Sequence, residues 1–173
     1  MAFIKVHKDV SYVGVGGAVW KKWLELNTLV PKFLTPAPAS DENKTDQKAA
    51  PVVPQVLCIA VSRDGSKLAI GSSDKVLNVV DTSTKEVVVS HRLPKAPTSC
   101  TFDKNAEWVI VGDRSGDICR YQLTAPGADE ELSGTISMVL DVVMTEDGRH
   151  LISADRDEKV RVSRYPQVII QFK

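Results

Sequence analysis

From residue 55 onwards, short runs of β-branched and apolar residues alternate with turn-forming residues such as Asp, Gly, Ser and Asn. This spacing is typical of an all-β fold built from short strands, because helical periodicity is absent over the same stretch. In the first such stretch the pattern predicts strands over residues 56–62, 67–72, 76–81 and 86–93. On the first strand of each unit we expect one buried face, comprising Leu57, Ile59 and Val61, then Cys100 and Phe102, then Leu140, Val142 and Met144.

The same pattern repeats along the chain with a period of about 41 residues. Moving residues 61–80 forward by 41 places them without gaps on 102–121, and moving them by 83 places them on 144–163. A period of this length with three or four strands per unit is typical of a β-propeller blade. In this register three turn pairs coincide, namely Asp64-Gly65, Asn105-Ala106 and Asp147-Gly148.

The repeat divides the chain into three four-stranded blades and an N-terminal part. The blades are expected over residues 55–96, 97–137 and 138–173, and the last ends inside its fourth strand, as a truncated blade would. Residues 1–35 are expected to form a partial first blade, although the segment VWKKWLELNTLV (19–30) suits a short helix as well as a strand. Residues 36–54 are rich in proline and charge, which predicts a polar loop.

Composition and charge narrow the classes of function. The 22 basic and 22 acidic residues give a formal net charge of zero, so no overall field would gather nucleic acid or an anionic membrane. The longest purely apolar run is residues 56–61, far short of the roughly 20 residues that a membrane-spanning helix needs, so we expect a soluble protein that does not contact membranes. The three cysteines and three histidines have no metal-ligand or disulfide-framework spacing, so we expect neither a metal nor another cofactor, and a reducing compartment.

Two stretches carry a resemblance to known proteins. GSSDKVLNVVD (71–81) resembles a WD repeat, with Val80-Asp81 in place of the terminal Trp-Asp. SMVLDVVMTEDGRHLISADRDEKVRVS (137–163), together with VGDRSGD (111–117), resembles the family of non-catalytic WD-repeat subunits of the tRNA (guanine-N(7)) methyltransferase. That resemblance implies an all-β, partial WD-repeat β-propeller.

The resemblance also implies a function. Such a protein has no catalytic residues of its own; it binds and stabilises the catalytic methyltransferase subunit, which forms N7-methylguanosine in the variable loop of tRNA. It would meet tRNA only indirectly, through the complex. The location it implies is the nucleus, with the cytoplasm as an alternative.

Candidate contact residues lie between the second and third strands of the blades. The repeat register gives Ser73, Arg114 and Arg156 equivalent positions there, so they should line one rim. A mixture of acids and bases follows Arg156, and such a patch suits a protein partner through specificity and association rate. Spacing alone favours another interpretation, namely solvated turn charges that pair within their own blade. The resemblance favours partner contact, and the candidate residues are Arg114, Asp155, Arg156, Asp157, Glu158, Lys159 and Arg161.

Two other functions remain open from the residues. One is a generic WD-repeat adaptor for some other protein, because a fold does not determine a function. The other is a propeller hydrolase or lyase, which would need carboxylates or histidines recurring at inward positions, and none recur. Ser99 stands in no G-x-S-x-G context, so we do not expect it to be a nucleophile.

Overall fold

The protein is a series of antiparallel sheets. The computed structural model describes residues 54–125 and 129–166 in full, and the strand backbone alone within residues 2–34. The first sheet consists of β1 (Ala2–His7), β2 (Val10–Val15), β3 (Ala18–Trp23) and β4 (Leu29–Leu34). The second has β5 (Val56–Val61), β6 (Lys67–Ser72), β7 (Val76–Asp81) and β8 (Val87–Arg92); the third has β9 (Pro97–Phe102), β10 (Trp108–Asp113), β11 (Asp117–Gln122) and β12 (Asp129–Gly134); the fourth has β13 (Val139–Met144), β14 (His150–Asp155) and β15 (Val160–Arg164).

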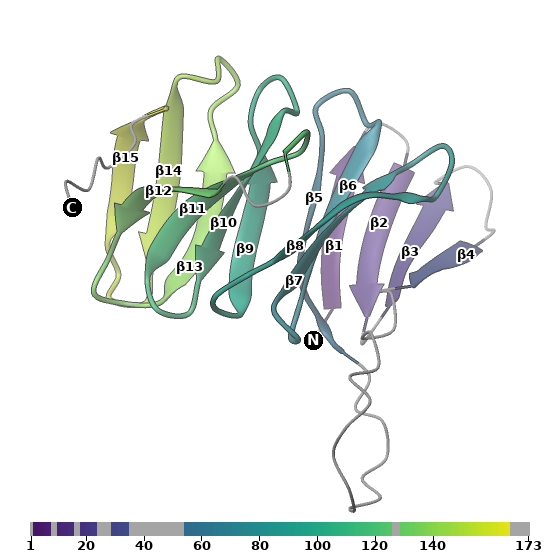
Figure 1. Cartoon of the computed structure of the whole chain (residues 1–173), viewed down its shortest axis with the longest axis horizontal. Helices are drawn as coiled ribbons and strands as arrows, with labels where there is room; N and C mark the ends of the chain where they lie inside the picture. The colour runs from purple at the N-terminus through teal and green to yellow at the C-terminus, as the bar shows by residue number, and fades with distance from the viewer. Residues whose placement is uncertain are drawn as a thin grey trace, which may run out of the picture.

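The sheets stand side by side in chain order, each a simple meander (Figure 1). Their first strands are neighbours: β1 lies against β5, β5 against β9, and β9 against β13. This arrangement confirms the all-β, propeller-type fold expected from the repeat. Of the two conformations left open for residues 19–30, the structure shows strand at both ends of the segment, in β3 and β4.

Turn geometry follows the repeat register. Gly65, Ala106 and Gly148, which the alignment makes equivalent, have φ angles of 79°, 53° and 72°. Each ends the turn between the first and second strands of its sheet. Ala106 adopts the left-handed conformation where the other two repeats use glycine, so the turn is maintained although the Asp-Gly pair is lost.

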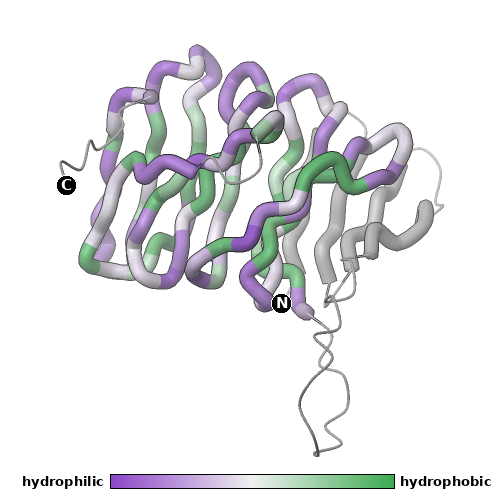
Figure 2. Tube along the Cα trace, in the orientation of Figure 1, coloured by the Kyte–Doolittle hydropathy of each residue, from purple (hydrophilic) through white to green (hydrophobic). Residues whose placement is uncertain are grey.

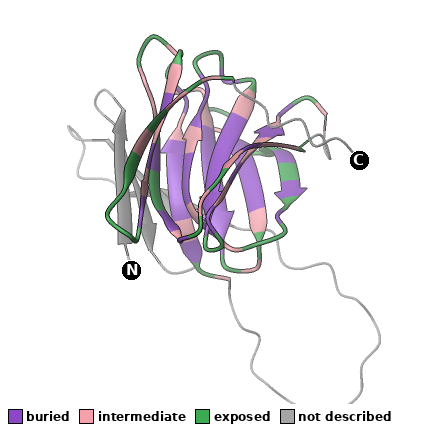
Figure 3. Cartoon of the chain, turned by 90° about the vertical axis from the view of Figure 1, so that its left-hand side faces the viewer, coloured by how far each residue is buried: buried purple, intermediate pink, exposed green. Residues whose placement is uncertain are grey.

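The core lies between the sheets. Cys58, Ala69 and Val79 of the second sheet pack against Phe102 and Val109 of the third. A further cluster fills the space between the third and fourth sheets and includes Ile110, Ile118, Val139, Val142 and Leu151. Buried residues therefore run along both faces of the central strands, while turns and outer strands are exposed (Figure 3). Apolar stretches along the strands alternate with polar turns (Figure 2).

A β-bulge near the start of the first strand changes the predicted buried face in the second and fourth sheets. The register shifts between Val56 and Cys58, and again between Val139 and Asp141, leaving one extra residue in each strand. Leu57 is half-buried as a result, and Leu140, expected to be buried, is 50% exposed. The expectation of one buried face was also too narrow, because Cys58 and Ala60, which alternate with Ile59, are buried too.

Two predictions fall outside the described residues: the loop at 36–54, apart from its last residue, and the fourth strand of the last blade, which would lie beyond residue 166. Within the described part of the chain, no helix has the length and apolar character needed to cross a membrane.

Candidate protein-interaction site

The predicted contact residues lie where the second strand turns into the third in the third and fourth sheets, except Arg161, which lies on β15. Ser73, Arg114 and Arg156 occupy equivalent positions in the turns between the second and third strands of their sheets and are exposed. Each donates its backbone N–H to the carbonyl of the residue just before the first strand of its own sheet. The three turns thus share one geometry. The bonds run from Ser73 to Gln55 (2.8 Å), from Arg114 to Ala96 (3.3 Å) and from Arg156 to Met138 (2.9 Å).

Buried aspartates shape the last two of these turns. Asp113 Oδ1 accepts hydrogen bonds from the backbone N–H groups of Ser115, Gly116 and Asp117, at 2.7 to 3.1 Å. In the fourth sheet Asp155 Oδ1 accepts two such bonds, from residues 157 and 159, at 3.0 and 3.1 Å. We call residues 113–117 and 155–160 the paired turns.

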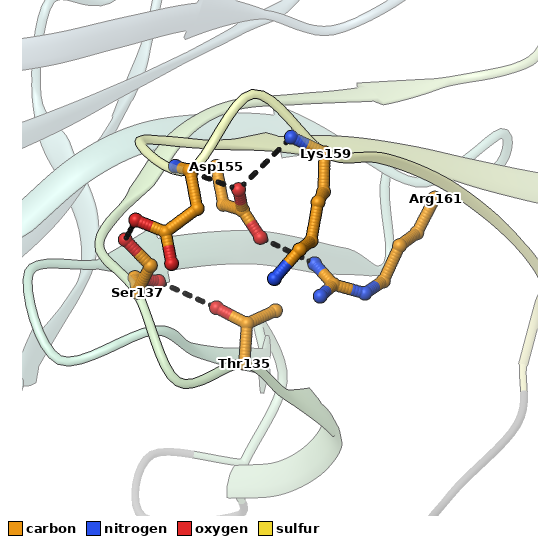
Figure 4. A network of polar contacts seen from close by, with 6 residues as sticks. Thr135, Ser137, Asp155, Lys159 and Arg161 are labelled. Carbon is orange, nitrogen blue, oxygen red and sulfur yellow. Dashed lines mark hydrogen bonds and ion pairs between the residues drawn. The ribbon is translucent and has the colours of Figure 1, made fainter.

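Asp155 also forms an ion pair inside its own sheet. Arg161 Nη1 on β15 donates to Asp155 Oδ2 at 2.6 Å, and the Asp155 side chain is only 2% exposed (Figure 4). The Arg161 hydrogen bond is the main reason that the pKa of the Asp155 carboxyl lies below its usual value. For these two residues the structure shows the pairing within one blade that spacing alone allowed. Asp155 therefore supports the turn from inside the sheet, whereas the Arg161 side chain is 37% exposed.

The other five predicted residues are exposed on the paired turns: Arg114, Arg156, Asp157, Glu158 and Lys159. Within the described residues, none of the three basic side chains forms an ion pair. Glu158 has a positive φ of 63°, and Gly116, at the equivalent position of the first turn, also has a positive φ, of 104°. The site therefore presents charges of both signs on turns whose backbone is hydrogen-bonded to buried aspartates.

Sequence reasoning missed the connection that joins the paired turns, residues 135–138 between β12 and β13. Ser137 is buried, and its Oγ donates to Asp157 Oδ1 at 2.8 Å (Figure 4). Thr135 N–H donates to the Gly116 carbonyl at 2.9 Å. A Thr and a Ser in a short connection between strands resemble any loop, so no local signal marked them.

Ser99 has a structural role. Its Oγ donates to Asp141 Oδ1 at 2.6 Å and accepts the Val142 N–H at 3.2 Å, so it joins β9 to β13. Because the Ser99 side chain is buried and links two sheets, the geometry offers no reason to consider it a nucleophile. No group of three or more potential metal ligands occurs among the described residues.

Comparison with known proteins identifies a family that the sequence matches. The model of the tRNA methyltransferase TRM82 WD40 domain matches residues 22–133 and 125–172. A Caenorhabditis elegans protein is 43% identical over 124 residues, covering 64% of this chain and 32% of the relative. A human protein is 34% identical over 109 residues, covering 62% of this chain and 26% of the relative. Both are named tRNA (guanine-N(7)-)-methyltransferase non-catalytic subunit.

The chain spans about a third of the length of the curated relatives that it matches. Among solved structures, a chain in the crystal structure of the mitotic checkpoint complex superposes with a TM-score of 0.72 at 18% identity, covering 94% of this chain and 45% of that one. At that identity the likeness concerns the fold alone. Because the family model matches most of the sequence, this chain belongs to the family of tRNA methyltransferase TRM82 WD40 domains.

Proposed function

We propose that this chain acts as a non-catalytic partner subunit of a tRNA (guanine-N(7)) methyltransferase and that its paired turns bind the catalytic subunit. The names of its relatives support the first part. The observation that carries the second part is the equivalent placement of Arg114 and Arg156, exposed and without ion-pair partners among the described residues.

The charge pattern favours a protein partner for these turns. Arg114, Arg156 and Lys159 lie beside the exposed acids Asp157 and Glu158. Such interspersed charges are matched by a surface that carries both signs in complementary positions, and they act mainly on specificity and association rate. A polyanion such as tRNA would meet attraction and repulsion together, and the chain has no net charge. We therefore assign the tRNA contact to the complex, through the catalytic subunit. The nuclear location rests on the resemblance and stays a prediction.

Charge reversal tests the assigned surface. Arg114→Glu and Arg156→Glu should each weaken capture of the purified catalytic subunit by about tenfold or more, since each places an unmatched carboxylate in the interface. Both side chains are exposed, so the melting temperature should stay within about 2 °C of wild type. Lys85→Glu is the matched control: Lys85 is also exposed, but it lies in the β7–β8 turn at the opposite end of its sheet.

Capture of the catalytic subunit by both reversed variants at wild-type strength would refute the assigned surface. Failure of the wild-type chain to bind that subunit, with capture of an unrelated protein instead, would favour the generic adaptor. The proposal also requires that the chain alone transfers no methyl group from S-adenosylmethionine to tRNA. Label transfer by the isolated chain would overturn its non-catalytic role.

A further inference from the structure

One residue of the connection between β12 and β13 is exposed to an unusual degree. Ile136 is 101% exposed, whereas the other large apolar side chains exposed in the described part of the chain range from 42% to 68%. All six of those others lie on strands, in β8, β13 and β15. A fully solvated isoleucine contributes nothing to folding, because its apolar surface is never removed from water.

Both neighbours of Ile136 are held in place, one by each of the paired turns. Thr135 N–H bonds to the Gly116 carbonyl at 2.9 Å, and Thr135 Oγ1 donates to the Ser137 carbonyl at 2.5 Å. Ser137 is buried and bonds to Asp157 of the second turn (Figure 4). A side chain presented on such a braced connection loses little loop entropy when a partner binds it.

In the first of the paired turns, Gly116 lets the connection between β12 and β13 approach the turn closely. A Cβ at Gly116 would overlap the carbonyl oxygen of Thr135 and lie 2.7 Å from that of Ser137. The φ of 104° at Gly116 is also one that residues with a side chain rarely adopt. Glycine therefore allows the connection to pack directly on the turn, and Ile136 lies between two residues that are each bonded to one of the paired turns.

We propose that Ile136 is the apolar anchor of the docking surface and inserts into an apolar pocket of the catalytic subunit, whose border carries carboxylates that meet Arg114 and Arg156. This inference rests on the proposed function. A fully exposed aliphatic side chain on a connection bonded to two charged turns suits such a pocket, because binding energy concentrates in central desolvated anchors with polar surroundings. An RNA surface would gain little from it, since RNA is bound through phosphate contacts and through stacking on aromatic or arginine planes.

Truncation of the side chain tests the anchor. Using the full chain and the purified catalytic subunit, Ile136→Ala should raise the dissociation constant by about 10- to 100-fold, and Ile136→Val by less than about fivefold. Val88→Ala is the matched control, because Val88 is a 53% exposed aliphatic residue on the outer strand β8. It should leave the dissociation constant unchanged. All three variants should have the melting temperature of the wild type, because the Ile136 and Val88 side chains are both exposed.

The outcomes separate the anchor from the proposed function. If the wild-type chain binds the catalytic subunit and Ile136→Ala binds equally well, the anchor is wrong and the proposed function stands. If the wild-type chain does not bind, both fail. A fall in affinity accompanied by a lower melting temperature would assign Ile136 a structural role instead. Binding of tRNA by the isolated chain that is lost with Ile136→Ala would assign the surface to RNA and overturn the inference.

Discussion

Packing between the third and fourth sheets leaves no room for a methyl group at Gly112. A Cβ at this position on β10 would lie 2.5 Å from Cγ1 and 3.0 Å from Cβ of Val139, and 3.3 Å from Cγ1 of Val142. Both valines are buried, and Val139 begins β13 directly after the connection that carries Ile136. The Gly112→Ala substitution therefore tests whether close sheet packing supports the docking surface.

The cost of this substitution follows from the distances. Carbon atoms attract best at about 3.5–4.0 Å, so the closest contact is about 1 Å too short. Forcing an extra methyl group into a packed core costs about 1–3 kcal/mol. Replacing glycine by alanine returns about 0.4–1 kcal/mol by restricting the unfolded chain. We expect a net loss of about 1–2 kcal/mol, which corresponds to a melting temperature about 2–8 °C lower for a chain of this size.

Thermal unfolding followed by far-ultraviolet circular dichroism measures the effect. Gly134→Ala is the matched control, because the nearest atoms to a Cβ there lie at 3.6 and 3.8 Å, which is ordinary van der Waals contact. It should change stability by less than about 0.5 kcal/mol. Combining Gly112→Ala with Val139→Ala should cost less than the sum of the single substitutions, because the smaller side chain makes room for the methyl group.

Two results would refute this reasoning. Gly112→Ala could be as stable as wild type, or its effect could add fully to that of Val139→Ala. Either would mean that the third and fourth sheets are not in direct contact at this point. In the expected case, binding to the catalytic subunit should weaken as well, since movement of Val139 displaces the connection that presents Ile136.

Three further predictions concern stability and reactivity. Hydrogen bonds, above all that of the Ser62 hydroxyl, lower the pKa of the Asp64 carboxyl to about 2, so the stability that the ionised carboxylate contributes is present above pH 4 and lost as the pH falls through 2. Asp64→Asn should therefore reduce the dependence of the unfolding free energy on pH in a series of urea-unfolding curves at acid pH. An unchanged dependence would contradict this. Burial raises the pKa of the Cys119 thiol to about 12, so it should resist thiol reagents at pH 8 until urea is added, and rapid labelling of the folded chain would be inconsistent with that burial. The Arg120 guanidinium lies 4.2 Å from the ring centre of Trp108, so Arg120→Ala should lower the unfolding free energy by about 0.5–2 kcal/mol. Arg120→Lys should recover part of that loss. Equal stability of the wild type and both variants would exclude a stabilising stack.

The sequence by itself determined the strands, the turns and the family. The 41-residue register predicted equivalent turns, and the left-handed φ angles at Gly65, Ala106 and Gly148 confirm it. It also aligned Arg114 with Arg156, whose backbone bonds match in the structure. These features are local: strand period and turn chemistry depend on residues within a few positions of each other, so one sequence is enough to find them.

Only the tertiary structure decided which side chains face inward and which face solvent. Asp155 and Lys159 belong to the same charged turn, but Asp155 is buried against Arg161, whereas Lys159 is exposed. Leu140 belongs to an apolar run and is half exposed, because a β-bulge makes it an extra residue in its strand. Ile136 is indistinguishable in sequence from a core residue, and its exposure follows from bonds that join two turns about 40 residues apart in the chain. Burial depends on which sheets pack together and where a bulge changes the register, and both are set by contacts between distant segments that local patterns do not record.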